Sequence, residues 1–417
     1  MNKIINYLQK KEFLKYFMVI FSGTLLAQLI TVLMSLVLTR LYTPAEFGVY
    51  GTYTAFVALL IVFTTGRYEF AINTAENEED ALTLFKIVNI LSLCFSIVVF
   101  ILILFFATEI KTLLNFNSDY QLLYYIPLTL FLMGLLQGSI YFLNRKKKFS
   151  ILAKSKVYQS IGNGVSATVG GVFGIGAIGI ILGNVVGLGT SYAYQKLKLP
   201  VNNVSKVNFT KIKKNLIEYK QYPLYNSPSA FFDSLAIQAP ILILLRFFSE
   251  VTVGYFSLTT RVIGMPLGLI STSISQVFLS QISELHRSGK SYKYLVIKIA
   301  KYLFLIALVP LIIIGGFGPK LFAFFFGEEW KIAGEFARIL SIGYFFKFIV
   351  APLSVIFFIN QKVKLLSIIQ VLRAFSTITL LYITSKHYNL ETVLLTYSIH
   401  EALFYLVYFF FIMKTSK

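Results

Sequence analysis

Five charged side chains lie in the middle of apolar stretches in the second half of this 417-residue chain. They are Asp233, Arg261, Lys347, Arg373 and Glu401. A charge at mid-depth in an apolar segment is costly, so it usually serves a function or is paired. The three cations outnumber the two carboxylates, and such an excess favours an anionic ligand. The carboxylates and the neighbouring His400 are also candidates for carrying a coupling proton, because burial favours the neutral form of a carboxyl.

The same charges have a structural interpretation. Asp233 with Arg261, and Glu401 with Arg373, can form ion pairs that hold helices together, and Lys347 then has no carboxylate left. Arg261 is followed by Gly264 and Gly268 at helical spacing, which places all three on one helix face. An Arg flanked by glycines suits a water-filled cavity better than lipid. We therefore expect Arg261, Lys347 and Arg373 to bind substrate in one cavity, with Asp233 and Glu401 close by.

The first half has no comparable mid-span charge. It offers uncharged polar side chains within its apolar stretches, of which Gln28, Asn89 and Gln137 are our candidates for lining a cavity. Arg67 and Glu69 lie near the end of an apolar stretch instead.

Metal and nucleotide chemistry have little support. The chain has one cysteine and three histidines, and they are too far apart in sequence for a local metal motif. No Walker A motif is present, and the glycines at 162–179 do not open a βαβ unit. We expect no cofactor and no metal, with a proton or sodium gradient as the candidate energy source.

The composition places these residues in a membrane. Apolar residues make up 57% of the chain and charged residues 13%, against about 45–50% and about 25% in soluble domains. A span needs about 20 apolar residues, and charge-poor stretches predict an all-α membrane protein with about 12 spans. These are 17–38, 47–65, 85–107, 121–144, 157–175, 177–195, 223–245, 252–280, 297–318, 335–359, 365–385 and 391–413.

The net charge of +20 follows the predicted topology. With a cytoplasmic N-terminus, most Lys and Arg residues fall in inner segments, as the positive-inside rule requires. The outer segments hold only Arg40, Lys111, Arg246, Lys320, Lys331 and Lys386. Both termini are therefore expected in the cytoplasm, and nucleic-acid binding is not needed to explain the charge. Attraction of the inner segments to anionic lipid would be a by-product.

Two segments are open to more than one interpretation. The glycine-rich stretch 157–195 is expected to form two tightly packed helices; one long kinked helix is the alternative, and it would invert the topology of everything that follows. Residues 2–15 suit either an interfacial helix or a solvated tail, and no cleavable signal follows them.

An internal repeat divides the chain. Arg40 and Arg246 each end a span, and Gly48 and Gly254 each follow eight residues later, with the same offset of 206 residues. An even number of spans in each half makes the repeat parallel, with a pseudo-two-fold axis along the membrane normal. We predict a six-helix bundle over 1–195, a basic cytoplasmic linker over 196–222 and a second six-helix bundle over 223–417.

The chain also resembles a known family. The segment from Gly23 to Gly48, the motif Arg67-Tyr68-Glu69, and several blocks of the second half are similar to Wzx-type polysaccharide flippases. Those later blocks are Tyr222-Pro223, Asp233, Val253 to Phe256, Arg261-Val262, Pro266-Leu267, Ser275 to Phe278, Phe326 to Trp330 and Ala337 to Leu340. The resemblance covers nearly the whole chain. No single block is diagnostic, but their order and spacing are fairly specific.

The resemblance implies a fold and a substrate. Wzx-type flippases belong to the multidrug/oligosaccharidyl-lipid/polysaccharide exporter superfamily, in which two six-helix bundles form a V around a central cavity. They move undecaprenyl-diphosphate-linked oligosaccharides across the bacterial inner membrane during O-antigen or capsule assembly, without catalysing a reaction. A polysaccharide polymerase and a chain-length regulator are candidate partners. The positions of charged cavity residues vary within this family, so the site residues named above rest on their burial and sign.

Two other classes of protein remain open. A drug or cation antiporter of the same superfamily would prefer an acidic cavity, and Lys347 argues against it. A polysaccharide polymerase would carry a large periplasmic loop, whereas the predicted outer loops here are short. We therefore expect a transporter and not an enzyme.

Overall fold

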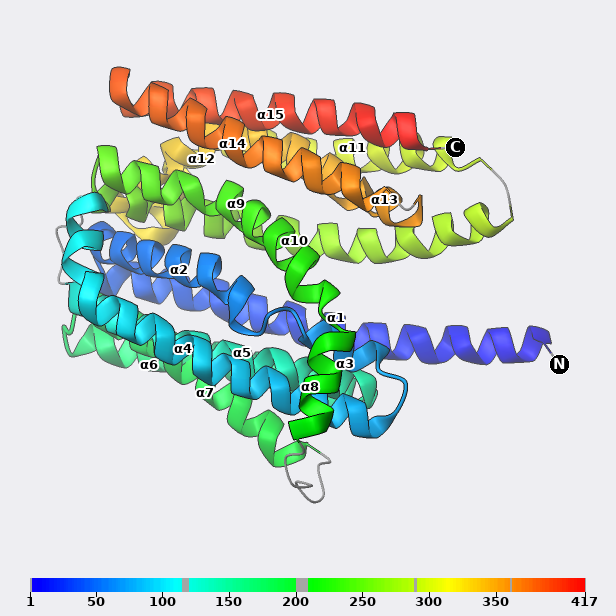
Figure 1. The fold of residues 1–417 in the computed structure, drawn as a ribbon. Coiled ribbons are helices and arrows are strands. Elements are labelled where there is room, and N and C mark those ends of the chain that lie inside the picture. The colour runs from blue at the N-terminus through cyan, green and yellow to red at the C-terminus, as the bar shows by residue number, and fades with distance from the viewer. Residues whose placement is uncertain (1, 115–119, 200–208, 289–290, 361, 417) are drawn as a thin grey trace. The chain divides into compact units, whose positions relative to one another are not determined.

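The computed structural model describes residues 2–114, 120–199, 209–288, 291–360 and 362–416. Over these residues the chain is helical and contains no strand (Figure 1). The long helices are α1 (Asn2–Leu41), α2 (Pro44–Thr64), α4 (Glu78–Leu114), α5 (Tyr125–Arg145), α6 (Phe149–Val172), α7 (Ala177–Lys198), α9 (Ser227–Phe247), α10 (Glu250–Arg287), α11 (Lys293–Phe326), α12 (Lys331–Val350), α14 (Val363–His387) and α15 (Leu390–Thr415). The short ones are α3 (Glu69–Thr74), α8 (Phe209–Glu218), α13 (Ile356–Ile359), the 3₁₀ turns Tyr120–Tyr124, Glu328–Trp330 and Ala351–Val355, and a π-helical turn at Tyr222–Asn226.

The predicted all-α membrane fold is confirmed. In the described part of the chain, eleven helices are long and apolar enough to cross a membrane. Among the long helices named above, α6 does not meet this criterion. It is long enough to cross a membrane, but it carries the polar residues Lys154, Lys156, Gln159 and Asn163. The predicted N-terminal helix exists as the first part of α1, but the side chains of its first residues lie outside the described residues.

The glycine-rich stretch forms two helices, so the prediction of a tight pair is confirmed and the single kinked helix is wrong. The turn between α6 and α7 contains Gly174 and Gly176 with φ of 65° and 63°, a left-handed conformation that glycine adopts without steric cost. Along the pair the backbones approach closely: a β-carbon on Gly170 would lie 2.6 Å from the α-carbon of Gly179. Any larger residue would force the two helices apart.

The helices group into two compact units. The first contains Tyr53–Leu113 and Asn117–Phe231 together with α1, and the second contains Phe232–Lys417 together with the segment Thr43–Thr52. The predicted division at 196–222 stays a prediction, and residues 200–208 of that segment lie outside the described residues.

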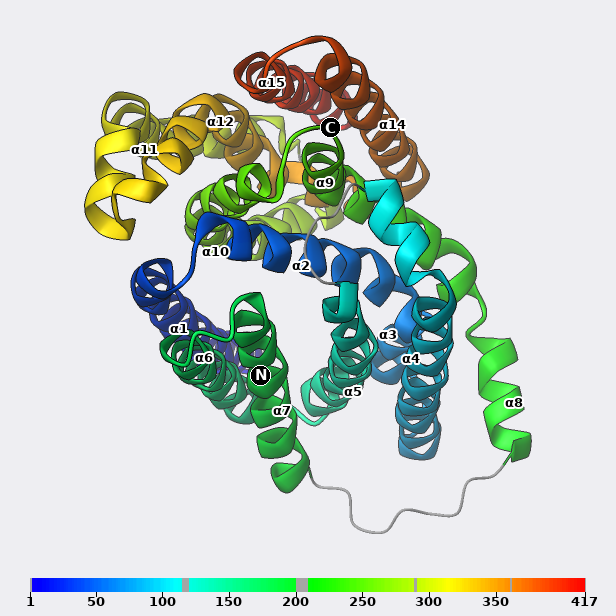
Figure 2. The same ribbon diagram turned by 90° about the vertical axis from the view of Figure 1, so that its left-hand side faces the viewer.

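In the first unit, α1 packs along α6 and α7 packs against both α6 and α5. Figure 2 looks along these helices and shows α1, α6 and α7 on one side, with α3, α4 and α5 on the other. The amphipathic α8 lies beside α4 (Figure 2), and its Ile212 and Leu216 pack against a core that includes Ala71 and Leu84. Lys211 pairs with Glu79, and the Tyr68 hydroxyl donates a 3.0 Å hydrogen bond to the carbonyl of Leu216. The predicted linker therefore holds a helix that docks on this unit.

In the second unit, α12 lies at the centre and contacts α10, α11 and α15. A large apolar core joins these helices, with Phe278, Tyr292, Val296 and Phe357 fully or almost fully buried. This core positions α12 and α15, which carry two of the predicted charges.

Within the second unit, the first turns of α2 cross the first turns of α10. A β-carbon on Gly48 would overlap the carbonyl oxygen of Glu250, and one on Gly254 would overlap the carbonyl oxygen of Pro44. The offset of 206 residues relates Gly48 to Gly254 and Pro44 to Glu250, so the contact is reciprocal. Such reciprocity is what a two-fold repeat requires at its axis, although the repeat itself stays a prediction.

Candidate functional site: a buried charge cluster in the second unit

The cluster is built on an ion pair between α14 and α15. The Arg373 guanidinium donates from Nε to Glu401 Oε1 at 3.2 Å and from Nη2 to Oε2 at 2.7 Å. Arg373 is 3% exposed and Glu401 5%. Bidentate geometry of this kind fixes both groups and recovers part of the cost of burying them. The ion pair between Arg373 and Glu401 that the sequence suggested is therefore present.

Aromatic rings and a second carboxylate complete the surroundings of Arg373. The guanidinium carbon lies 5.6 Å from the centre of the Phe404 ring and 5.4 Å from that of Tyr405, within the range of cation–π attraction. Asp233 of α9 approaches with Oδ1 4.0 Å from Nη1. Its side chain is 46% exposed, against 4% for that of Arg373. The Asp233 side chain is thus the exposed member of an otherwise buried cluster.

Lys347 of α12 joins the cluster without a carboxylate of its own. Its ammonium lies 5.4 Å from the centre of the Tyr344 ring, one turn earlier on the helix. Arg373, Glu401 and Asp233 are close enough to interact with it electrostatically. Among the described residues Lys347 makes no ion pair, so its charge is held only by weaker interactions.

Arg261 does not pair with Asp233, and that predicted pair is wrong. Asp233 faces Arg373 because α9 and α14 bring these two residues together. Arg261 lies on α10, and its Nε is buried with no hydrogen-bond partner among the described residues. One turn further on, a β-carbon on Gly264 would lie 3.7 Å from the Tyr344 ring. Gly264 and Tyr344 therefore lie close to each other. Arg261 is one helical turn from Gly264, and Lys347 is one helical turn from Tyr344.

His400 is near the pair but is not part of it. Its Nε2 lies 2.9 Å from the Ser376 hydroxyl, while Nδ1 is 4.0 Å from Glu401 and has no hydrogen-bond partner in the described structure. The imidazole thus lies between a hydroxyl, which it contacts, and a carboxylate, which it does not.

The packing of α12 on α15 fixes the cluster. The backbone N–H of Gly343 donates to the Ser398 hydroxyl at 3.1 Å, and that hydroxyl donates to the carbonyl of Ile339 at 2.7 Å. A β-carbon on Gly343 would lie 3.2 Å from that of Glu401, which only a glycine leaves uncrowded. These contacts hold Glu401 beside the helix that carries Lys347.

The predicted polar residues of the first half lie in the first unit. Asn89 of α4 has a buried Oδ1 without a partner among the described residues, and Gln137 of α5 lies 3.4 Å from the Thr65 hydroxyl. That hydroxyl donates to Glu69 at 2.5 Å. Burial raises the pKa of the Glu69 carboxyl above its usual range, and the hydrogen bond from Thr65 partly offsets this. Gln28 lies half-buried on α1.

The sequence interpretation missed the tyrosines of the second unit. Tyr344 lies under Lys347, and Tyr405 lies under Arg373. Their spacing gave a signal: Tyr344 precedes Lys347 by three residues and Tyr405 follows Glu401 by four, so each shares a helix face with a predicted charge.

Comparisons with known proteins agree with this fold. Residues 37–335 match the model of a family described as "Polysaccharide biosynthesis protein". A capsular polysaccharide biosynthesis protein, CapF of Staphylococcus aureus, is 28% identical over 158 residues, which is 37% of each chain. The aligned part thus spans little more than a third of that relative.

Solved transporters share the architecture. The lipid II flippase MurJ in an inward closed conformation has a TM-score of 0.75 at 17% identity, covering 94% of this chain and 87% of that one. An inward-facing multidrug resistance MATE family transporter of the MOP superfamily has a TM-score of 0.70 at 17% identity, covering 95% and 94%. The resemblance to polysaccharide flippases inferred from the sequence is thereby confirmed. Because the family model matches most of this chain, the chain belongs to the polysaccharide biosynthesis protein family, and its apolar helices make it a multi-pass membrane protein.

Proposed function

We propose that the protein is a flippase for a polyprenyl-diphosphate-linked oligosaccharide. It moves this substrate from the cytoplasmic to the outer leaflet of the bacterial inner membrane for capsule or O-antigen assembly. The observation that carries the proposal is Lys347, a cation beside a buried ion pair that itself makes no ion pair among the described residues, in a chain of a polysaccharide biosynthesis family. The relative CapF, a capsular polysaccharide biosynthesis protein, supports the same process.

The chemistry of the substrate supports this assignment. Its sugars and diphosphate must cross about 30 Å of hydrocarbon, while its polyprenyl tail is soluble there. A cation held at mid-depth lowers the cost of bringing a diphosphate to that depth. Lys347 fits this role because its charge is not neutralised by an ion pair in the described structure. Arg261 is the second candidate for the same headgroup.

The ion pair has a different role in this proposal. Arg373 and Glu401 satisfy each other, so they form a rigid frame that positions Lys347. Asp233 is the more exposed carboxylate and is therefore the better candidate for coupling transport to a proton or sodium gradient, with His400 as a proton relay. Gln28, Asn89 and Gln137 are proposed to hydrogen-bond sugar hydroxyls.

Alternating access completes the mechanism that we propose. Two six-helix halves would open in turn to each side of the membrane, and the close crossing of α2 with α10 would be one contact that forms and breaks. Both termini would lie in the cytoplasm. A polysaccharide polymerase and a chain-length regulator would receive the product.

A drug or cation antiporter is the alternative function. Its fold is compatible, since one structural neighbour is a multidrug resistance transporter. A cationic ligand would, however, meet Lys347 and Arg261 with neither of them neutralised by an ion pair in the described structure. These two cations without an ion pair therefore favour an anionic substrate.

Lipid analysis of a deletion strain tests the proposal. One lipid-linked repeat unit should accumulate in the inner leaflet, and surface polysaccharide should disappear. Lys347→Ala should fail to restore polysaccharide at normal membrane levels of protein, Lys347→Arg should restore part of it, and Lys386→Ala, at the exposed end of α14, should restore all of it. Full restoration by Lys347→Ala would show that this ammonium does not engage substrate.

A further inference from the structure

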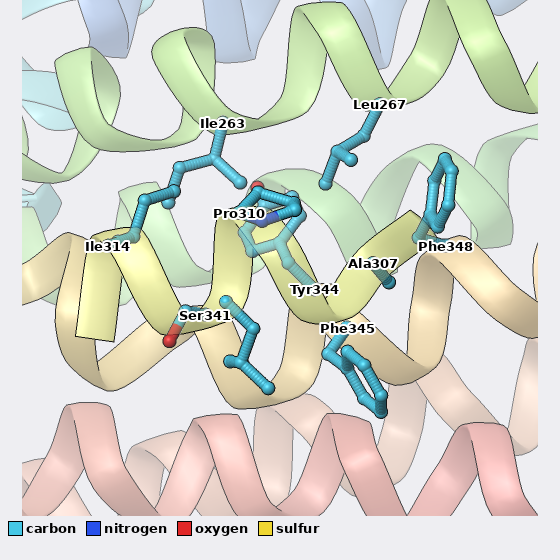
Figure 3. Close-up of a pocket in the computed structure, with 10 residues that line it drawn as sticks. Ile263, Leu267, Ala307, Pro310, Ile314, Ser341, Tyr344, Phe345 and Phe348 are labelled. Carbon is cyan, nitrogen blue, oxygen red and sulfur yellow. The ribbon is translucent and has the colours of Figure 1, made fainter. Parts of the chain in front are cut away.

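A pocket in the second unit is too small for an organic ligand. It lies between α10, α11 and α12 and is lined by Leu267, Pro310, Tyr344 and Phe348, among others (Figure 3). Its volume is about 20 Å³. A cavity needs about 10–15 Å³ to hold a single water molecule, so this space belongs to helix packing. The outward surface of α8 in the first unit, by contrast, carries side chains that packing does not explain.

One side of α8 is fixed to the first unit. Lys211 pairs with Glu79. The side-chain amide of Asn215, which is 1% exposed, donates to Asp80 at 3.2 Å. Glu79 and Asp80 belong to the first turn of α4, and the apolar residues on this side of α8 pack against the core of the unit. These contacts hold α8 at the start of α4 and leave its opposite side facing outward.

That outward side alternates large apolar residues with lysines. Phe209, Lys213 and Ile217 follow one another at a spacing of four residues, so they share one helix face. Lys220 and Leu224 continue the row in the turns that follow. Phe209 is 82% exposed, Ile217 56% and Leu224 60%. The two lysines are exposed as well, and neither makes an ion pair within the described part of the chain. Large apolar side chains exposed together and bordered by charges mark an interaction surface.

The position of α8 indicates what this outward row contacts. The exposed large apolar residues of α4 begin at Ile90 and continue to Phe106, which is the part of the helix that suits lipid tails. α8 is held before this part, at Glu79 and Asp80, and it runs crosswise to α4 (Figures 1 and 2). A short helix that lies crosswise at the polar end of a membrane span lies in the plane of the interface.

We propose that the outward row of α8 binds the anionic phospholipid surface of the cytoplasmic leaflet, the side on which the sequence predicts this segment. Apolar side chains of an interfacial helix enter the boundary between headgroups and acyl chains, while lysines extend to the phosphates. A soluble protein partner fits less well, because α8 lies directly beside the lipid-facing part of α4.

The charge of the row sets the expected selectivity. Each lysine near an anionic leaflet contributes about 1 kcal/mol, which is a factor of about five. Lys213 and Lys220 together should therefore favour an anionic over a zwitterionic lipid by about 25-fold. This inference does not depend on what the protein transports. It assigns to α8 a specific contact, beyond the general attraction of basic segments to anionic lipid.

Quenching by brominated lipids tests the inference in the full-length protein, without any transport substrate. Phe209→Trp keeps an aromatic ring in the outward row, and the wild-type protein, whose single tryptophan Trp330 is buried, gives the background. Vesicles would contain phosphatidylcholine and phosphatidylglycerol in equal amounts, with bromine on the acyl chains of one or the other. Brominated phosphatidylglycerol should quench the added indole at least threefold more strongly, and high salt should reduce this preference because it screens exposed charges. Equal quenching by the two lipids, or no quenching by either, would overturn the inference.

Substitutions locate the contact. Lys213→Gln with Lys220→Gln, combined with Phe209→Trp, should remove the preference for phosphatidylglycerol. Lys148→Gln with Lys154→Gln removes the same charge at exposed positions around the start of α6 and should keep the preference. Equal effects of these two pairs would refute the placement on α8.

A second measurement guards against a disturbance by the added tryptophan. Mass spectrometry of the lipids that copurify with the protein needs no change at Phe209. Phosphatidylglycerol should be retained by the wild-type protein and reduced at least tenfold in Lys213→Gln with Lys220→Gln. Unchanged retention in that variant would contradict the inference.

Discussion

The crossing of α2 and α10 gives the sharpest structural prediction. Gly254→Ala places a methyl carbon 2.7 Å from the carbonyl carbon of Pro44 and in overlap with its oxygen. Backbone cannot rotate away as a side chain does, so the helices must separate by about 1 Å, and such overpacking costs about 1–3 kcal/mol. The conformation in which α2 and α10 touch should therefore become less populated by a factor of about 5–150.

Gly268→Ala is the matched control. It lies on the same helix, and a β-carbon there would meet nothing within 4 Å. Alanine has a higher helix propensity than glycine by up to about 1 kcal/mol, so this variant should be neutral or slightly stabilised. The contrast between the two variants isolates the helix contact from helix propensity.

Disulfide formation measures the crossing directly. In a Cys94→Ser background, Gly51→Cys and Ser257→Cys would face each other, since a β-carbon on Gly51 lies 3.1 Å from that of Ser257. This separation is close to the range that a disulfide requires. Gly254→Ala should slow cross-linking at least fivefold, and Gly268→Ala should leave it unchanged. Equal rates in the two variants would refute the close crossing.

Three further predictions concern the charges and the topology. Arg373→Leu alone should destabilise the protein by about 3–5 kcal/mol because it leaves Glu401 buried without a partner, whereas Arg373→Leu with Glu401→Leu should regain most of the melting temperature; a double variant as unstable as the single one would contradict the pairing. Because the raised pKa of Glu69 makes its charged form unfavourable, stability should fall as pH rises from about 4.5. Glu69→Gln should therefore melt higher than the wild type at pH 7.5 and equal to it below about pH 4, and a difference independent of pH would argue against this origin. A cysteine at Lys147 should resist a membrane-impermeant thiol reagent in intact cells, and one at Lys320 should react; labelling in the opposite sense would invert the predicted topology.

Much of the fold could be predicted because the membrane imposes it. A chain with this hydropathy must satisfy its backbone within each span, so apolar stretches predict helices and their lengths. The α6–α7 pair was predictable for a more local reason, since glycines at Gly170 and Gly179 allow backbones to touch. The helix α8 was missed because its segment was interpreted only by charge, although its apolar residues follow a helical period.

The charges could be identified from sequence, but only some of their partners could. Arg373 and Glu401 were named as a possible pair, and the structure confirms it. A pair between Asp233 and Arg261 was one structural alternative, whereas Asp233 faces Arg373, which lies far along the chain. Which helices adjoin depends on the packing of the whole unit, and no local pattern encodes that. Tyr344 was overlooked because one tyrosine among many apolar residues gives no signal until its neighbour Lys347 is considered.

Transport by the purified protein tests the central claim most directly. The protein would be reconstituted into vesicles that carry a fluorescent polyprenyl-diphosphate-linked oligosaccharide in one leaflet, with quenching by an impermeant reagent as the readout. We predict that the wild-type protein makes the label accessible from the other side and that Lys347→Gln, at equal protein, does so at least tenfold more slowly. Failure of the wild-type protein to move this lipid, or equal rates for both proteins, would contradict a cationic flippase site in the second unit.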